Sequence, residues 1–173
     1  MAAASSDVPQ DLHSEFLRNN ADFAAKFEDG SLPLPPARQA LVLACMDARL
    51  HPEKVLGIRI GACHCVRNAG GRASDDAIRS IAISQRLLGT KEVHIVHHTD
   101  CGMLTFTNDQ IAAKIKTDLG VDVAGRDFLP FPDLDQSVRD DVAIVKASPL
   151  VAPGTVVHGY VYDVTTGKVR VVA

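Results

Sequence analysis

Two apolar segments separated by a helix-length stretch constrain the fold of this chain more than any other feature. They are Ala40–Cys45 (ALVLAC) and Glu92–His98 (EVHIVHH). The first is apolar throughout, which is typical of a parallel strand buried on both faces. Residues 74–88 begin with Ser-Asp-Asp and are followed by Gly89, which are residue types that begin and end α-helices. Strands that alternate with helices predict an α/β fold with a mostly parallel central sheet flanked by helices.

The remaining elements are expected on both sides of this unit. Residues 155–173 alternate between apolar and polar positions around a turn at 165–168, which predicts a C-terminal antiparallel hairpin strand. Further predicted elements are an amphipathic helix over 10–28, a short strand in CHCVRN (63–68), a helix over 103–119, and a helix over 137–148. We expect one domain over 1–173, with residues 1–35 as an N-terminal helical arm.

Charge and hydropathy exclude several classes of partner. The net charge of -3 lacks the basic excess that nucleic-acid binding requires. No apolar run approaches the roughly 20 residues of a membrane helix. Residues 1–16 include three acidic and no basic residues, unlike a secretory or transit peptide. We therefore expect a cytoplasmic protein with neither nucleic acid nor membrane as a partner.

Three candidate metal ligands lie at or just after the ends of the two apolar segments. Cys45 ends the first segment, His98 ends the second, and Cys101 comes three residues later. Because the carboxyl ends of parallel strands meet at one edge of a sheet, these side chains are expected to lie close together. Two thiolates and one imidazole suit zinc and leave a fourth position open. The predicted helix after Cys101 would also favour its thiolate. The alternative is a core cysteine at 45 with histidines that cap a turn.

Two charged residues follow the first cysteine at alternate positions. Asp47 and Arg49 stand two and four residues after Cys45, so an extended chain would point all three the same way. An aspartate there could accept a hydrogen bond from a water on the metal, and an arginine could keep that aspartate ionised and oriented. The alternative is an ordinary surface ion pair.

Several motifs together carry a resemblance to a known family. CMDAR, RNAGG and HTDCG, in this order, resemble the β-class carbonic anhydrases, in particular their short archaeal and bacterial branch. The resemblance implies that Cys45, His98 and Cys101 bind one zinc ion per chain. It implies that Asp47 and Arg49 form the catalytic pair and that the Gly102 N–H binds the substrate anion. His97 stands where the family often has glycine, and we interpret it as packing at the strand end.

The resemblance also implies an activity and an assembly. Members of this family hydrate carbon dioxide reversibly to bicarbonate and a proton, using a zinc-bound hydroxide as the nucleophile. In this family the aspartate can instead ligate zinc and close the site. Members are homodimers or larger, which implies a homodimer or a dimer of dimers here, with the apolar N-terminal helix against a partner.

One segment departs from the family pattern. GACHCVRNAGG has Ala62 where an acidic residue is common, and Cys63 and Cys65 flank His64. Neighbouring strand residues face opposite sides, so one ion could not easily bind Cys63, His64 and Cys65 together. The departure leaves the substrate open, because relatives on this fold hydrolyse carbonyl sulfide or carbon disulfide. Two hypotheses from different classes of protein also stand: a zinc-stabilised module without turnover, and a metal-free nucleotide-binding domain.

Overall fold

A computed structural model describes residues 11–173 and divides the chain into two compact units, with the boundary between Leu32 and Pro33. The expected helix over 10–28 and the arm over 1–35 both begin outside the described residues. In the first unit, α1 spans Leu12–Ala24, and the Asp11 carboxylate caps it by accepting from the Ser14 N–H at 3.2 Å. The helix ends before residue 28 because its last turn changes to i→i−3 hydrogen bonds, such as Lys26 N–H to Phe23 O at 3.1 Å. No side chain of α1 is buried within its unit.

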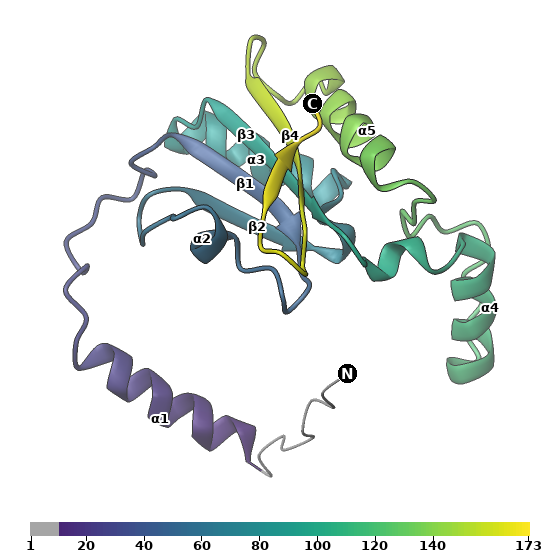
Figure 1. Cartoon of the computed structure of the whole chain (residues 1–173), viewed down its shortest axis with the longest axis horizontal. Helices are drawn as coiled ribbons and strands as arrows, with labels where there is room; N and C mark the ends of the chain where they lie inside the picture. Colours follow the sequence, from purple (N-terminus) through teal and green to yellow (C-terminus); the bar gives the residue numbers. More distant parts are fainter. Residues whose placement is uncertain (1–10) are drawn as a thin grey trace. The chain divides into compact units, whose positions relative to one another are not determined.

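The second unit is built on a five-stranded sheet with the order β2-β1-β3-β4-β5 (Figure 1). The four strands β2, β1, β3 and β4 are parallel, and β5 pairs with β4 in the antiparallel direction. The predicted α/β fold with a mostly parallel sheet and a C-terminal antiparallel strand is therefore confirmed. The strands are β1 (Ala40–Cys45), β2 (His64–Asn68), β3 (Glu92–His98), β4 (Val156–Tyr162) and β5 (Val169–Val171).

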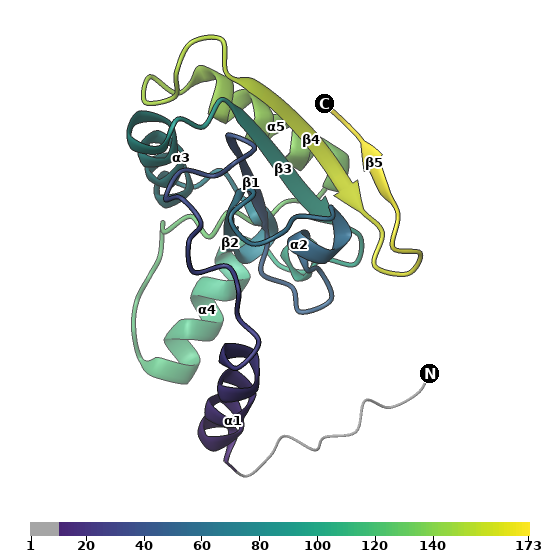
Figure 2. The same cartoon turned by 90° about the vertical axis from the view of Figure 1, so that its left-hand side faces the viewer.

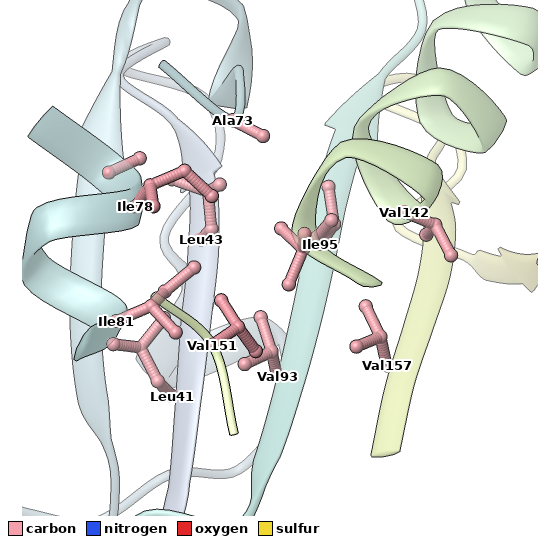
Figure 3. Packing of buried hydrophobic residues seen from close by; sticks show 12 residues of the cluster. Leu41, Leu43, Ala73, Ile78, Ile81, Val93, Ile95, Val142, Val151 and Val157 are labelled. Atoms are coloured by element: carbon pink, nitrogen blue, oxygen red, sulfur yellow. The ribbon is translucent and has the colours of Figure 1, made fainter. Parts of the chain in front are cut away.

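Two helices cover one face of this sheet (Figure 2). They are α3 (Asp75–Leu88) and α5 (Leu134–Ala147). Figure 3 shows Ile78 and Ile81 of α3 beside Leu43 and Leu41 of β1, and Val142 of α5 beside Val157 of β4. Burying one aliphatic side chain in such a cluster contributes about 1.5–3 kcal/mol. The core on this face thus holds β1 and β3 side by side, which brings their carboxyl ends together.

The opposite face of the sheet carries a second apolar cluster that includes Cys45 and Cys101. It is built from strand residues and from segments that follow the strands. These segments include α2 (Pro52–Val55), the 3₁₀ turn η2 (Gly102–Leu104) and the loop before α5. A second 3₁₀ turn, η1 (Ala69–Gly71), follows β2. Both candidate cysteine ligands are therefore packed among apolar side chains.

Three helices after β1 differ from the sequence-based prediction. The helix α4 spans Asn108–Leu119 and begins later than expected, because Thr107 and Gln110 form a capping box there. α5 begins at Leu134, earlier than expected, because the Asp133 carboxylate accepts from the Gln136 N–H at 2.8 Å. The four-residue helix α2 was not predicted at all. No helix among residues 11–173 has the length and apolarity needed to cross a membrane.

Candidate metal centre

The ends of β1 and β3 bring three metal-binding side chains together. Cys45 is the last residue of β1, His98 is the last residue of β3, and Cys101 follows three residues after His98. One ligand atom from each residue lies within 4.8 Å of the other two, and all three residues are buried. This is the one such group of three or more metal-binding side chains among residues 11–173. The predicted convergence at the carboxyl edge of the sheet is therefore present in the structure.

The imidazole of His98 is oriented for a ligand. Its Nδ1 lies 2.8 Å from the carbonyl oxygen of Thr99, which assigns the proton to Nδ1 and leaves the Nε2 lone pair free. Nε2 is buried and has no hydrogen-bond partner among the described residues. A buried polar atom without a hydrogen-bond partner destabilises the folded state. The free Nε2 atom therefore indicates that a ligand such as a metal ion binds there. A backbone carbonyl behind the distal nitrogen is the usual way in which proteins orient a metal-binding histidine.

The contact between the two thiols favours ionisation of Cys45 and disfavours ionisation of Cys101. A hydrogen bond from Cys101 lowers the pKa of the Cys45 thiol, against the effect of burial, and His98 adds to the lowering. The same contact with Cys45, together with burial, raises the pKa of the Cys101 thiol. Without a compensating positive charge, one cysteine therefore stays protonated while the other ionises. A divalent cation between them would allow both to bind as thiolates.

A hydrogen-bonded pair of charged residues lies beside this cluster. The Arg49 guanidinium donates to both carboxylate oxygens of Asp47, from Nε to Oδ1 at 3.0 Å and from Nη2 to Oδ2 at 2.8 Å. Asp47 Oδ2 is 3.8 Å from the free Nε2 of His98. Asp47 is not one of the three clustered ligands. The carboxylate is therefore turned toward Arg49 and borders the cluster.

Two further residues that sequence reasoning missed hold this pair in place. Asp100, in the HTDCG motif, accepts from Arg49 Nη1 at 2.7 Å through Oδ2, and its backbone carbonyl accepts from Nη2 at 3.0 Å. Arg67, in the RNAGG motif, donates to the carbonyl oxygens of Cys45 at 3.1 Å and Asp47 at 2.8 Å. The acidic residue at 100 and the arginine at 67 were visible as parts of the motifs, but no spacing rule linked them to CMDAR. Their contacts span 51 and 20 residues along the chain.

Gly102 lies immediately beyond the last candidate ligand. It is exposed, and no atom approaches within 4 Å of the place where a Cβ would stand. Among residues 11–173 no hydrogen bond to its N–H is formed. The three-residue turn η2 begins here, whereas the α-helix expected directly after Cys101 begins only at Asn108. The expected α-helix directly after Cys101 is therefore replaced by a single 3₁₀ turn, whose Met103 N–H still donates to the Cys101 sulfur.

Comparison with known proteins decides the family. The family model described as carbonic anhydrase matches residues 40–121. β-Carbonic anhydrase 1 of Mycobacterium tuberculosis is 45% identical over 158 residues, which cover 90% of this chain and 94% of that protein. The chain belongs to the β-carbonic anhydrase family. The crystal structure of a carbonic anhydrase from Streptococcus mutans has a TM-score of 0.91 to this chain at 44% identity, and covers 96% of this chain and 99% of its own.

The β-carbonic anhydrase relatives include proteins named for another substrate. A carbon disulfide hydrolase of Saccharolobus solfataricus is 37% identical over 180 residues, which cover 90% of this chain and 86% of that protein. The motifs CMDAR, RNAGG and HTDCG predicted membership of this family, and the comparisons confirm it. They also confirm the similarity to the branch that includes carbon disulfide hydrolases.

The segment that departs from the β-carbonic anhydrase pattern forms no second metal cluster within the described part of the chain. His64 Nδ1 lies 2.7 Å from Ser84 Oγ on the side of α3, whereas Cys65 packs into the apolar cluster on the opposite face of the sheet. Cys63 precedes β2, and Ala62 is buried. Over residues 11–173, the side chains of Cys63, His64 and Cys65 do not converge as metal ligands would. This agrees with the expectation that alternation would place them on opposite faces.

Proposed function

We propose that this protein catalyses the reversible hydration of carbon dioxide to bicarbonate and a proton, at one zinc ion per chain. The observation that carries the proposal is the buried cluster of Cys45, His98 and Cys101, in which His98 Nε2 has no partner among the described residues, beside the pair Asp47 and Arg49. Membership of the β-carbonic anhydrase family supports the same chemistry.

The donor set fits zinc. Two cysteine sulfurs and one imidazole nitrogen are the ligands of known three-ligand catalytic zinc sites, which keep a fourth position open. Cys45, Cys101 and His98 would hold the ion, because their ligand atoms lie within 4.8 Å of one another and His98 Nε2 has no partner among the described residues. When bound, zinc would lower the pKa of a water molecule to about 7 and so supply a nucleophile near neutral pH.

The remaining residues would orient the reactants. Asp47 lies 3.8 Å from His98 Nε2 and would accept a hydrogen bond from the nucleophilic water, which aligns its lone pair with the substrate carbon. Arg49 keeps the carboxylate ionised and fixed, because it engages both oxygens. The free N–H of Gly102 would donate to the bicarbonate oxygen. Because Arg49 engages both Asp47 oxygens, the aspartate would leave the fourth position to water.

Two measurements test the proposal on the purified protein. Elemental analysis should find about one zinc per chain, and stopped-flow proton release should show saturable hydration of carbon dioxide. A metal-free protein that retains its fold would contradict the zinc site. Zinc with no hydration of carbon dioxide would favour a zinc-stabilised module without turnover.

A comparison of turnover rates distinguishes carbon dioxide from its sulfur analogues as the preferred substrate. Carbonyl sulfide and carbon disulfide are linear molecules of the same shape, and the family includes carbon disulfide hydrolases. Sulfide release from each should be measured on the same preparation as proton release from carbon dioxide. A kcat/KM for either sulfur substrate above that for carbon dioxide would contradict the proposal that carbon dioxide is the preferred substrate.

We also propose a single domain in which residues 1–35 act as an arm in a homodimer or a dimer of dimers. Support comes from α1, whose large apolar side chains Phe16, Leu17 and Phe23 are 60%, 59% and 53% exposed. Such an apolar helix face gains stability when a second copy covers it. Light scattering coupled to size exclusion should give a dimer or tetramer mass, and a double change, Phe16→Glu with Phe23→Glu, should shift it toward the monomer.

A cytoplasmic location completes the proposal. All four cysteines are free thiols in the structure. A reducing compartment would keep the Cys45 and Cys101 thiols available for the metal. Cell fractionation followed by immunoblotting should find the protein in the soluble fraction, and recovery with membranes would contradict this assignment.

A further inference from the structure

A buried network of charged residues lies next to the candidate metal centre. Asp141 of α5 accepts from Arg72 Nε at 2.8 Å and lies 3.1 Å from His97 Nε2, in both cases through its Oδ2 atom. His97 Nδ1 is 2.8 Å from Ser137 Oγ on the same helix. Arg72, His97 and Asp141 are 8%, 0% and 1% exposed. His97 is therefore more than packing at the strand end, because it joins a charged network beside the candidate ligand His98.

One branch of this network reaches Cys45. His97 Nε2 also lies 3.2 Å from the carbonyl oxygen of Gly71, and the Arg72 N–H donates to Asn68 Oδ1 at 2.8 Å. These contacts hold the turn η1 tightly on the end of β1. A Cβ at Gly71 would stand only 2.9 Å from the backbone nitrogen of Cys45. The backbone N–H of Gly70, in the same turn, donates to the Cys45 sulfur.

A second branch reaches Cys101. Arg72 Nη1 donates to the carbonyl oxygen of Leu129 at 2.8 Å, and its guanidinium lies 5.3 Å from the centre of the Phe131 ring. The Phe131 N–H donates to the carbonyl oxygen of Met103 at 3.2 Å. The Met103 N–H in turn donates to the Cys101 sulfur. The network is thus connected to a backbone donor at each of the two candidate thiolate ligands.

Stability alone does not account for this network. A buried ion pair contributes little more than well-packed apolar side chains would, because both charges lose their water. Asp141 lies on the buried face of α5 among Val138, Val142 and Val145, with Ser137 as the other polar residue there, and its Oδ1 atom is buried with no partner among the described residues. An aliphatic residue would suit the same position for packing. The directional contacts of the carboxylate therefore point to a positioning role.

We propose that Asp141 is a positioning residue for the metal centre, which fixes through His97 and Arg72 the backbone amides that donate to Cys45 and Cys101. The inference rests on the proposed function only in taking these cysteines as metal ligands. N–H···S hydrogen bonds draw charge from a thiolate and fix its direction, so both the geometry of the metal and its retention depend on them. Asp141 touches neither metal nor substrate.

The test uses the full chain loaded with cobalt, whose sulfur-to-cobalt charge-transfer bands and d–d bands report ligand geometry. Asp141→Asn keeps the size of the side chain and removes its charge. The matched control is Asp135→Asn, because Asp135 also lies on α5 and pairs with an arginine, Arg170, on the surface. The second readout is the rate at which a chelator removes the metal, and the third is the separation of kcat from KM.

For Asp141→Asn we expect shifted cobalt bands, metal loss about 10–100-fold faster, and a lower kcat at nearly unchanged KM. Asp135→Asn should match the unaltered protein in all three readouts. Unchanged bands and unchanged metal loss in a folded Asp141→Asn protein would overturn the proposal. So would equal changes in both variants, since these would indicate a general effect of charge on α5.

A second variant keeps the proposal testable if Asp141→Asn does not fold. Arg72→Lys preserves a positive charge beside Asp141 but removes the planar group that reaches Leu129. It should shift the cobalt bands, and unchanged bands in this variant would overturn the proposal. Failure of the proposed function can be distinguished from failure of this inference. In that case the unaltered protein would show normal cobalt–thiolate bands but would not hydrate carbon dioxide.

Discussion

Arg49 holds the carboxylate of Asp47 at both oxygens, with Nε 3.0 Å from Oδ1 and Nη2 2.8 Å from Oδ2. The hydrogen bond from the Arg49 side chain holds the pKa of Asp47 well below its usual range. Because a lowered pKa favours the ionised form, Asp47 stays an anion throughout the neutral range. It can therefore accept a hydrogen bond there, and it loses this ability only in strong acid.

Loss of Arg49 should impair catalysis without removing the metal. In Arg49→Ala the pKa of Asp47 should rise toward its usual range, and the carboxylate should lose its fixed orientation. We expect kcat/KM for carbon dioxide to fall about 10–100-fold while zinc content stays unchanged. Stopped-flow hydration with parallel elemental analysis measures both. Arg79→Ala, which breaks the exposed Arg79–Asp76 pair, is the control and should retain full activity. An active Arg49→Ala protein would exclude the proposed role of the pair.

Serine substitution should distinguish the cysteines of the metal centre from the other two. Cys45→Ser and Cys101→Ser should each reduce zinc to a small fraction of one per chain, because a hydroxyl is a poor ligand for this ion. Cys63→Ser and Cys65→Ser are matched controls of the same chemistry outside the cluster, and they should keep the metal. Elemental analysis after dialysis against a chelator measures the difference. Equal metal loss in all four variants would refute the assignment.

Cys65 should react slowly with alkylating reagents at neutral pH. Burial, with the neighbouring Glu53, raises the pKa of Cys65 to about 12. The thiolate is the reactive form, and at pH 8 it should amount to a fraction on the order of 10⁻⁴. Iodoacetamide labelling followed by mass spectrometry should show a rate that rises steadily from pH 7 to pH 10, and Glu53→Gln should increase it. A rate that levels off near pH 8 would contradict the raised pKa.

Substitution of Gly71 should destabilise the fold through a clash and an unfavourable backbone angle together. Gly71 has φ +70°, and a Cβ there would lie 2.9 Å from Cys45 N and 3.0 Å from the carbonyl carbon of Ala44. We expect Gly71→Ala to lower the free energy of unfolding by about 2–4 kcal/mol. Gly89→Ala has a similar φ of +75° with no atom within 4 Å, so it should cost about 1–2 kcal/mol. Urea denaturation of both variants isolates the contribution of the close approach.

Local sequence signals were sufficient for most of the fold. The apolar run of β1, the Ser-Asp-Asp start of α3 and the glycine after it each follow from short-range physics, and the structure has these elements at the predicted residues. Errors arose where a boundary depended on one capping side chain. Thr107 and Asp133 moved the starts of α4 and α5, because their hydroxyl and carboxylate oxygens bind backbone N–H groups that periodicity does not register.

The sequence by itself determined the family and the three candidate ligands, because CMDAR and HTDCG place cysteine and histidine at the ends of strands that had to be neighbours. Only the tertiary structure decided how these side chains are supported. Asp141 stands 44 residues after its partner His97, and Asp100 stands 51 residues after its partner Arg49, so no local pattern connects either pair. One sequence signal was available, since Asp141 falls on the same helix face as Val138, Val142 and Val145. Its partners could be found only once the sheet had brought η1, β3 and α5 together, because packing in three dimensions, and not spacing along the chain, sets contacts between distant residues.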